Sequence, residues 1–316
     1  MRTAVATPRL GFLGVGWIGR NRLDAVVDAE VAEAAAIADP AVPGALRTLD
    51  ELLEQELDGV VIATPSALHA EQAIAALDAG LAVFCQKPLG RNEAEARAVV
   101  EAARRADRLL GVDLSYRHTE AARRCRDLVR AGAVGTVYAV ELAFHNAYGP
   151  DKPWFYDAEL AGGGCVVDLG THLVDLALWT LGSPEVTRVT ARLLHHGGHA
   201  VEDYAVARLD LAGGACVLLA CSWNLAVGRP AAIEAAFYGT DGSVAFENVG
   251  GSFYDFRGEL RRGAAVDVLC EPPDDWGGRA ICAWAEQLAV DRSFDPAVEE
   301  VVAVAGVLDR IYEVAA

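Results

Sequence analysis

An apolar run over residues 10–15 leads into three glycines with G-x-G-x-x-G spacing, Gly14, Gly16 and Gly19, and helix-compatible residues follow. In a strand–turn–helix unit, the first glycine permits a tight turn, the second lets a pyrophosphate approach the backbone, and the third lets helix and strand pack closely. The N–H groups and dipole at the start of such a helix bind phosphate. The chain is therefore predicted to begin with a dinucleotide-binding βαβ unit, which indicates an α/β fold.

An acidic residue stands where a dinucleotide-binding unit uses one. Residues 34–38 are predicted as the second strand, and Asp39 ends it, twenty residues after Gly19. A carboxylate there accepts hydrogen bonds from the adenosine ribose hydroxyls and repels a 2′-phosphate. No arginine or lysine follows until Arg47, so the sequence favours NAD over NADP. The alternative is that Asp39 is a turn residue before Pro40.

Strands and helices continue to alternate up to residue 113. Further strands are predicted over 59–63, 81–85 and 109–113, and helices over 49–56, 64–80 and 92–105. Five strands alternating with helices make a doubly wound parallel sheet, in which ligands bind outside the carboxyl ends of the strands. The predicted cofactor contacts on this edge are Gly14, Gly16, Trp17, Ile18, Gly19, Asp39, Thr64, Pro65, His69, Gln86 and Lys87.

Lys87 follows the fourth predicted strand at the same edge, between the uncharged residues Gln86 and Pro88. A partly desolvated ammonium group there suits a proton donor or a hydrogen bond to a substrate hydroxyl. The alternative is a solvated surface lysine.

The pattern changes after residue 118. A helix is predicted over 119–131, strands over 136–145, 186–195, 204–211, 215–223, 231–238, 243–247, 252–257 and 264–269, and helices near 277–290 and 296–315. Glycine-containing loops such as 212–214 and 240–242 predict hairpins. We expect a dinucleotide-binding Rossmann domain at 1–118 and a substrate-binding α+β domain at 119–316, with a large, mostly antiparallel open sheet.

The apolar segment 162–179 carries one polar stripe, because Asp168, His172 and Asp175 recur at the i, i+4, i+7 spacing of a helical face. Buried carboxylates and imidazoles are costly unless they are hydrogen-bonded or paired. From these residues alone, three interpretations stay open. They are a self-satisfied ladder that ties the helix to a neighbour, a metal site that lacks clear third and fourth ligands nearby, and an acid–base pair.

The composition excludes several classes of partner. A net charge of −18 argues against nucleic acid and anionic membranes, since both need a cationic face. No apolar run approaches the ~20 residues of a membrane span, and the N-terminus lacks the apolar core of a cleavable signal, so we expect a cytoplasmic location. The seven cysteines are scattered without a C-x-x-C pair, which predicts reduced, mostly buried thiols.

Three motifs, in order, carry a family likeness: the glycine turn 14–19, the Lys87-Pro88 pair, and GGGxxxDxGxHxxD over 162–175. Together they resemble the Gfo/Idh/MocA oxidoreductases, the group of glucose–fructose oxidoreductase and inositol dehydrogenase, over essentially the whole chain. The resemblance implies NAD(H)-dependent hydride transfer between the nicotinamide and a secondary alcohol or ketone of a sugar, cyclitol or related polyol. It also implies a homodimer or homotetramer that assembles through the C-terminal sheet.

The resemblance further implies residue roles. Lys87 and His172 flank the reacting oxygen; in oxidation His172 takes the hydroxyl proton, and Lys87 stabilises the oxygen as charge develops. Asp168 orients the imidazole, and Asp175 gives structural support. The Lys-Pro bond of the family is often cis, which extends to Pro88.

The chain departs from the family's Glu-Lys-Pro pattern at Gln86, which keeps the hydrogen-bonding shape of glutamate without its charge, and activity is expected to survive. Arg117 is a candidate substrate contact through a hydroxyl, carboxylate or phosphate, and Trp154 through stacking on a sugar ring. Packing is the alternative for the aromatic residue. The histidines at 195, 196 and 199, together with Glu202 and Asp203, are interpreted as part of a solvated loop rather than a metal cluster.

Two other functions stay open. One is an NAD-dependent glycosidase or lyase that uses transient oxidation and elimination, with no net NADH. The other is a non-catalytic dinucleotide-sensing protein, which the presence of both Lys87 and His172 disfavours.

Overall fold

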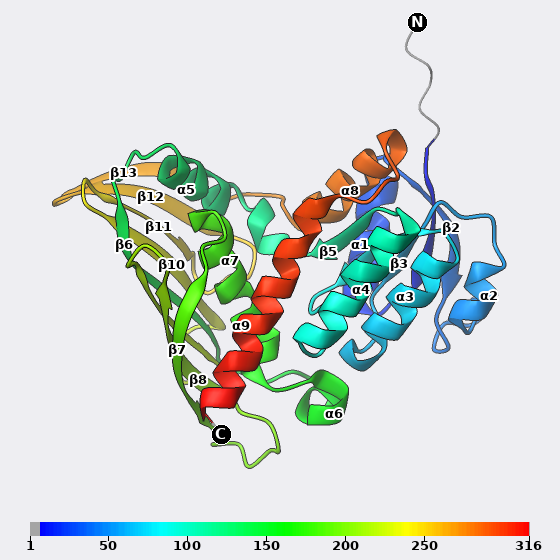
Figure 1. The fold of residues 1–316 in the computed structure, drawn as a ribbon, viewed down its shortest axis with the longest axis horizontal. Helices are drawn as coiled ribbons and strands as arrows, with labels where there is room; N and C mark the ends of the chain where they lie inside the picture. Colours follow the sequence, from blue (N-terminus) through cyan, green and yellow to red (C-terminus); the bar gives the residue numbers. More distant parts are fainter. Residues whose placement is uncertain (1–6, 316) are drawn as a thin grey trace, which may run out of the picture. The chain divides into compact units, whose positions relative to one another are not determined.

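The computed structural model describes residues 7–315, which form two compact units (Figure 1). The first unit contains the chain up to Ser115 together with Gly277–Val302. The second contains Tyr116–Trp276 and the residues from Ala303 onward.

The C-terminal part of the chain is divided differently from the predicted boundary, which placed all of 119–316 in one domain. Helix α8 (Arg279–Val290) belongs to the first unit because it buries its apolar face in that unit's core. Its Trp284 ring lies 5.5 Å from the ring of Phe84, centroid to centroid. The apolar burial of α8, and not its place in the sequence, decides which unit it joins.

The first unit is built on a five-stranded parallel sheet with the order β2-β1-β3-β4-β5. Its strands are β1 (Arg9–Leu13), β2 (Glu33–Ala38), β3 (Gly59–Ile62), β4 (Ala82–Gln86) and β5 (Leu110–Asp113). Every residue of β3 and β4 is buried, as expected for parallel strands covered on both faces. The predicted doubly wound α/β fold is confirmed.

Helices connect these strands. They are α1 (Trp17–Asp28), α2 (Leu49–Leu53), α3 (His69–Asp78) and α4 (Glu93–Ala106). Thr48 caps α2 in a capping box with Glu51, and Asn92 caps α4 by accepting from Glu95 N at 2.9 Å. These local hydrogen bonds explain why the two helices begin where the sequence predicted.

The second unit is built on an eight-stranded sheet with the order β13-β12-β11-β10-β6-β9-β8-β7. Its strands are β6 (Val137–Asn146), β7 (Val186–Leu194), β8 (Tyr204–Leu211), β9 (Cys216–Ser222), β10 (Ala231–Gly239), β11 (Ser243–Asn248), β12 (Phe256–Arg262) and β13 (Ala265–Cys270). Only the β6–β9 pair is parallel among its described pairings. The predicted large, mostly antiparallel sheet is confirmed.

One predicted strand, 252–257, is shifted in the structure. Gly250 and Gly251 both have positive φ, and the Ser252 hydroxyl accepts hydrogen bonds from Tyr254 N and Asp255 N. This side-chain turn takes up the backbone donors that a strand would use. The strand β12 therefore begins only at Phe256.

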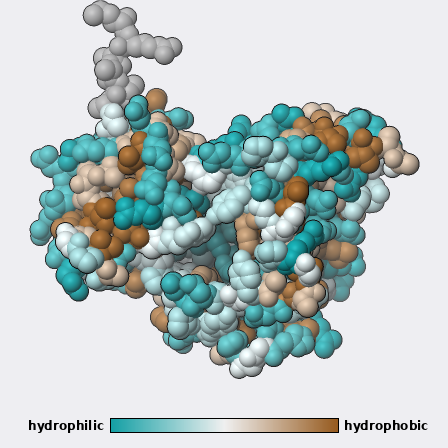
Figure 2. Space-filling model, turned by 180° about the vertical axis from the view of Figure 1, so that it is seen from behind, coloured by the Kyte–Doolittle hydropathy of each residue, from teal (hydrophilic) through white to brown (hydrophobic). Residues whose placement is uncertain are grey.

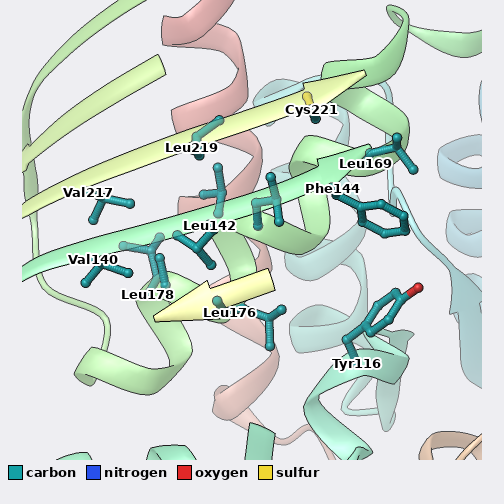
Figure 3. Packing of buried hydrophobic residues seen from close by; sticks show 14 of the residues in the cluster. Tyr116, Val140, Leu142, Phe144, Leu169, Leu176, Leu178, Val217, Leu219 and Cys221 are labelled. Atoms are coloured by element: carbon teal, nitrogen blue, oxygen red, sulfur yellow. The ribbon is translucent and has the colours of Figure 1, made fainter. Parts of the chain in front are cut away.

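Helices cover one face of this sheet (Figure 1). They are α5 (Glu120–Arg130), α7 (Thr171–Leu181) and the C-terminal part of α9 (Glu300–Ala315), with the short α6 (Ala158–Ala161) before α7. Figure 3 shows alternate side chains of β6 and β9, such as Leu142 and Leu219, pointing toward apolar side chains of the α7 region, such as Leu176. This layer is the core of the second unit.

The stretch Ala158–Leu181 is long and apolar enough to cross a membrane by length and composition alone, which the sequence analysis did not anticipate. Its most apolar window is 89% buried inside the protein. Since its apolar side chains pack against the sheet, this stretch serves as a core helix.

Candidate active site

The glycine loop between β1 and α1 has the geometry that its spacing predicts. Gly14 has φ +83°, and a Cβ built on it would lie 2.8 Å from the carbonyl oxygen of Ala63. A Cβ on Gly19 would lie 2.1 Å from the carbonyl oxygen of Gly14. A Cβ on Gly16, in contrast, would meet nothing within 4 Å. Two glycines thus serve internal packing, and the middle one leaves the loop surface open.

The N-terminus of α1 fits an anionic ligand. Gly16 is its N-cap, and within the described residues no side chain caps the helix and no acidic side chain lies in its first turn. Trp17 and Ile18 begin the helix, and the Trp17 side chain is 71% exposed. The first-turn N–H groups and the helix dipole therefore face an open surface that suits the pyrophosphate of a dinucleotide.

Asp39 follows β2 and holds the glycine loop in place. Its Oδ2 accepts a hydrogen bond from Val15 N at 2.9 Å, and its Oδ1 accepts one from Ala41 N at 2.9 Å. A carboxylate has about four lone-pair sites, so each oxygen keeps an acceptor site for a ribose hydroxyl.

Thr64 and Pro65 follow β3 at the same edge, where Pro65 begins a short 3₁₀ turn and the Thr64 hydroxyl donates to Gln72 Oε1. His69 was predicted as a cofactor contact, but its side chain is turned inward and only 1% of the residue is exposed. Its Nδ1 lies 2.7 Å from the carbonyl oxygen of Pro88 and its Nε2 lies 2.7 Å from that of Thr64. Burial lowers the pKa of His69 and outweighs these carbonyls, which favour the protonated ring. His69 thus ties two loops together from beneath.

Lys87 follows β4, and its peptide bond to Pro88 is cis, as the resemblance implied. The residue is half-buried, and its positive charge contributes to lowering the pKa of His69. The chain has only one other lysine, Lys152, which is also followed by a proline. Lys152 is exposed and paired with its neighbour Asp151 at 3.3 Å.

In the second unit, the predicted polar stripe lies on a helix with an irregular start. A π-helical turn, Val166–Gly170, precedes α7. Asp168 lies in this turn, and its Oδ2 accepts a hydrogen bond from the indole Nε1 of Trp223, after β9, at 3.1 Å. The indole N–H therefore orients the carboxylate to which the family resemblance gives the role of positioning His172.

His172 and Asp175 both face the 3₁₀ turn Ser115–His118. The His172 ring packs edge-on against Tyr116, with centroids 4.7 Å apart. Burial, with the Asp168 charge as the next cause, raises the pKa of the Tyr116 hydroxyl, so this group stays protonated at neutral pH. The imidazole thus lies against a neutral, buried aromatic wall.

Asp175 and Arg117 form an ion pair. Arg117 Nε donates to both carboxylate oxygens of Asp175 at 3.0 Å, and its Nη2 donates to Oδ1 at 2.5 Å. The guanidinium also lies 5.6 Å from the ring centroid of Trp179. The structural support predicted for Asp175 has its partner here, and the group predicted to contact substrate is engaged within its own unit.

The start of the helix that carries Asp168 and His172 is clamped by two residues that the sequence analysis did not single out for this role. Buried Glu202 accepts hydrogen bonds from Gly164 N at 3.0 Å, Val166 N at 2.9 Å and the Tyr312 hydroxyl at 2.8 Å. The Gly164 backbone is pressed against Glu202, since a Cβ there would lie 2.0 Å from the Glu202 carbonyl oxygen. The glycine triplet signals such a close approach, but not the residue that makes it.

Aromatic rings lie beside Asp168. Trp154 is half-buried and stacks on Phe155 at 3.9 Å, while Phe155 and Tyr156 pack edge-on against Trp223. The segment 154–156, which contains the predicted substrate contact Trp154, is therefore linked to Asp168 through Trp223. Across residues 7–315, no three histidine, cysteine, aspartate or glutamate side chains are grouped so that they could hold a metal ion.

Comparison with protein families gives two matches. Residues 9–114 match a model described as an oxidoreductase family with an NAD-binding Rossmann fold, and residues 122–245 match the GFO/IDH/MocA C-terminal domain. Together the two matched segments cover most of the chain.

Curated relatives share this similarity. The chain is 30% identical to inositol 2-dehydrogenase of Streptomyces avermitilis, over 93% of this chain and 90% of that protein. It is also 30% identical to the rhizopine catabolism protein MocA of Rhizobium meliloti, over 82% of this chain and 89% of that protein. A third relative is levoglucosan dehydrogenase of Pseudarthrobacter phenanthrenivorans, with 30% identity over 68% of this chain but only 60% of that protein.

Solved structures show the same fold. GenD2 from gentamicin A biosynthesis, in complex with NAD, superposes with a TM-score of 0.80 at 25% identity, covering 98% of this chain and 94% of that one. Aldose-aldose oxidoreductase from Caulobacter crescentus gives a TM-score of 0.86 at 21% identity, covering 98% of both chains, and supports the fold alone.

Proposed function

The chain belongs to the Gfo/Idh/MocA family of NAD(P)-dependent oxidoreductases, and we propose that it transfers hydride between NAD and a secondary alcohol or ketone of a sugar, cyclitol or related polyol. The observation that carries the proposal is the open, uncapped start of α1 behind the glycine loop, which fits the pyrophosphate. NAD, when bound, supplies the hydride acceptor or donor.

The roles proposed for the protein's own residues are those that the family resemblance implies. In oxidation, His172 takes the proton of the substrate hydroxyl, and Lys87 donates a hydrogen bond to that oxygen. Asp168, held by the Trp223 indole, positions the imidazole. In reduction the proton moves the other way.

Asp39 supports NAD rather than NADP as the cofactor. Its carboxylate is fixed by the Val15 and Ala41 N–H groups, so it cannot swing away from an incoming 2′-phosphate. A fixed negative charge at this place repels that phosphate and accepts ribose hydroxyls. Replacing Asp39 by serine should therefore raise the affinity for NADPH relative to NADH.

The substrate that fits best is uncharged. The Arg117 guanidinium is bonded to Asp175, so the arginine that could have bound a carboxylate or phosphate is already neutralised. The aromatic residues beside Asp168 suit the apolar face of a sugar ring. The names of the relatives, inositol 2-dehydrogenase and levoglucosan dehydrogenase, point to the same neutral class.

The sheet of the second unit supports a proposed self-association. Along β9, Val217 and Leu219 are buried under helices, whereas Leu218 between them is 46% exposed on the opposite face, with Val206 of β8 at 38%. Figure 2 shows a separate hydrophobic area among hydrophilic residues, toward the end of this unit that carries β12 and β13. We propose that this outer face binds a second copy of the chain.

The two lysines allow a matched test. The purified protein is mixed with NAD and a panel of sugars, inositols and aminocyclitols, and NADH absorbance is followed. Lys87→Ala should abolish turnover of any substrate found, while Lys152→Ala should leave it unchanged, because Lys152 is exposed and paired locally. Undiminished turnover in Lys87→Ala would refute the assigned mechanism, and release of an aglycone without net NADH would show that the protein uses elimination instead.

A further inference from the structure

Gln86 and Asp113 are partners across the β4–β5 pair, at the carboxyl ends of both strands. Gln86 is 8% exposed and Asp113 is 1% exposed. The Gln86 Nε2 group donates a hydrogen bond to Asp113 Oδ2. The residue that directly precedes Lys87 is therefore bonded to a buried carboxylate.

Arg22 of α1 pairs with this carboxylate. Its Nε donates to Asp113 Oδ2 at 2.5 Å, and its Nη1 donates to the carbonyl oxygen of Gly277. The side chains are almost completely buried, at 7% exposure for Arg22 and 0% for Asp113. The guanidinium is the oppositely charged partner that a carboxylate at this depth needs.

From this geometry we infer that Asp113, held by Arg22, is a positioning residue that sets the orientation of the Gln86 amide. Asp113 Oδ2 accepts from the guanidinium and can bond the amide only as an acceptor, so Gln86 turns its NH2 group toward it. The carbonyl oxygen Oε1 is then the end of the amide left to accept from a donor on a dinucleotide bound at this edge. In this last step the inference rests on the proposed cofactor.

The same geometry accounts for glutamine at position 86. A glutamate there would place a second carboxylate against Asp113 Oδ2, and like charges at this distance force one group to take a proton. Asp113 Oδ1 is buried and has no hydrogen-bond partner among the described residues, so the described surroundings hold no spare donor for another negative charge. A protonated glutamate would donate its O–H to Asp113 and thereby imitate the glutamine.

The test is a double-mutant cycle of Gln86→Glu and Asp113→Asn, read by NADH fluorescence titration and thermal unfolding between pH 5 and 8. In Gln86→Glu, we expect NADH binding about tenfold weaker at pH 8 than in the wild type, as for loss of one hydrogen bond to a charged group. Affinity and stability should recover as the pH falls. In the double variant, the introduced asparagine can donate to the introduced glutamate, so this pH dependence should disappear.

Gln86→Met is the control, because it removes the amide without adding charge and should weaken binding equally at every pH. The inference is overturned if Gln86→Glu shows no pH dependence of its own, or if Asp113→Asn does not remove it. Should Gln86→Glu fail to fold, recovery of the fold by Asp113→Asn supports the inference, and no recovery contradicts it. If the wild type binds no NADH, the proposed function fails, while the unfolding cycle still tests the coupling of the two residues.

Discussion

Arg117 donates three hydrogen bonds to Asp175 across 58 residues of sequence, joining the turn that begins the second unit to the middle of α7. The Asp175 side chain is 2% exposed and that of Arg117 is 18% exposed. The pair also places Tyr116, the neighbour of Arg117, against His172. The Arg117–Asp175 ion pair takes no part in the proposed reaction, but it helps to hold Tyr116 against His172, the candidate base.

Asp175→Asn should destabilise the protein by about 3 kcal/mol, because breaking a buried pair leaves a charge without its partner. Chemical denaturation measures this loss. Asp210→Asn is the matched control, since Asp210 pairs with the exposed Arg208 and should cost less than about 1 kcal/mol. Equal losses in the free energy of unfolding would show that the Arg117–Asp175 pair stabilises the protein no more than an exposed ion pair does.

In the glycine loop, two similar substitutions should affect different properties, one the stability of the protein and the other its affinity for NADH. Gly19→Ala should lower the free energy of unfolding by about 3 kcal/mol, because its Cβ would collide with the Gly14 backbone. Gly16→Ala should fold normally, since its Cβ meets no atom, yet bind NADH about tenfold more weakly because a pyrophosphate must approach there. Normal NADH affinity in Gly16→Ala would show that this loop does not bind the pyrophosphate.

His69 should make stability depend on pH. Its pKa is lowered in the fold by burial, so the unfolded chain binds this proton more readily than the folded protein does. The stabilisation of the fold by neutral His69 is fully present above the unfolded-state pKa of about 6.5 and is lost as the pH falls below that value. His69→Gln should cost about 2 kcal/mol at pH 7, as a buried carbonyl loses its donor, and this cost should shrink toward pH 5.

Urea unfolding at a series of pH values measures the His69 effect. His196→Gln, on the exposed loop after β7, serves as the control and should change the free energy of unfolding little. A constant cost for His69→Gln over the same range would contradict the assignment.

Glu202 should make stability depend on pH in the opposite direction from His69. Burial raises its pKa above that of the unfolded chain, so the folded protein binds this proton more readily, and the wild type loses stability as the pH rises from about 4.5. Glu202→Gln cannot titrate, and its Oε1 can still accept from Val166 N and the Tyr312 hydroxyl. The variant should therefore gain stability relative to the wild type between about pH 4.5 and 8, as measured by thermal unfolding at each pH. A relative loss over that range would mean that the ionised form is the one the fold favours.

The proposed outer-face interface predicts that Leu218→Arg lowers the molecular mass in solution. A charged side chain at this exposed apolar position would be buried without a partner if two sheets met there. Light scattering after size-exclusion chromatography measures the mass. Val290→Arg, at a position 80% exposed in the first unit, should leave it unchanged. A wild type that is already monomeric would end this proposal.

The sequence by itself determined the features that depend on neighbouring residues. The glycine spacing of 14–19, the caps at Thr48 and Asn92, and the alternation of strands and helices were all predictable, because turns, caps and periodicity act over a few residues. The order of three motifs also identified the family. The predicted start of a strand at Ser252 was wrong because a side-chain turn competes with the ladder there.

Only the tertiary structure decided which distant groups share a buried contact. Asp175 meets Arg117, Glu202 meets Gly164, and Gln86 meets Asp113, each pair separated by 27 to 58 residues. It turned His69 inward, which local spacing does not reveal, and it placed α8 in the first unit. The physical reason is that a buried polar group must find a partner wherever the packing of apolar faces brings one, and that choice belongs to the whole fold.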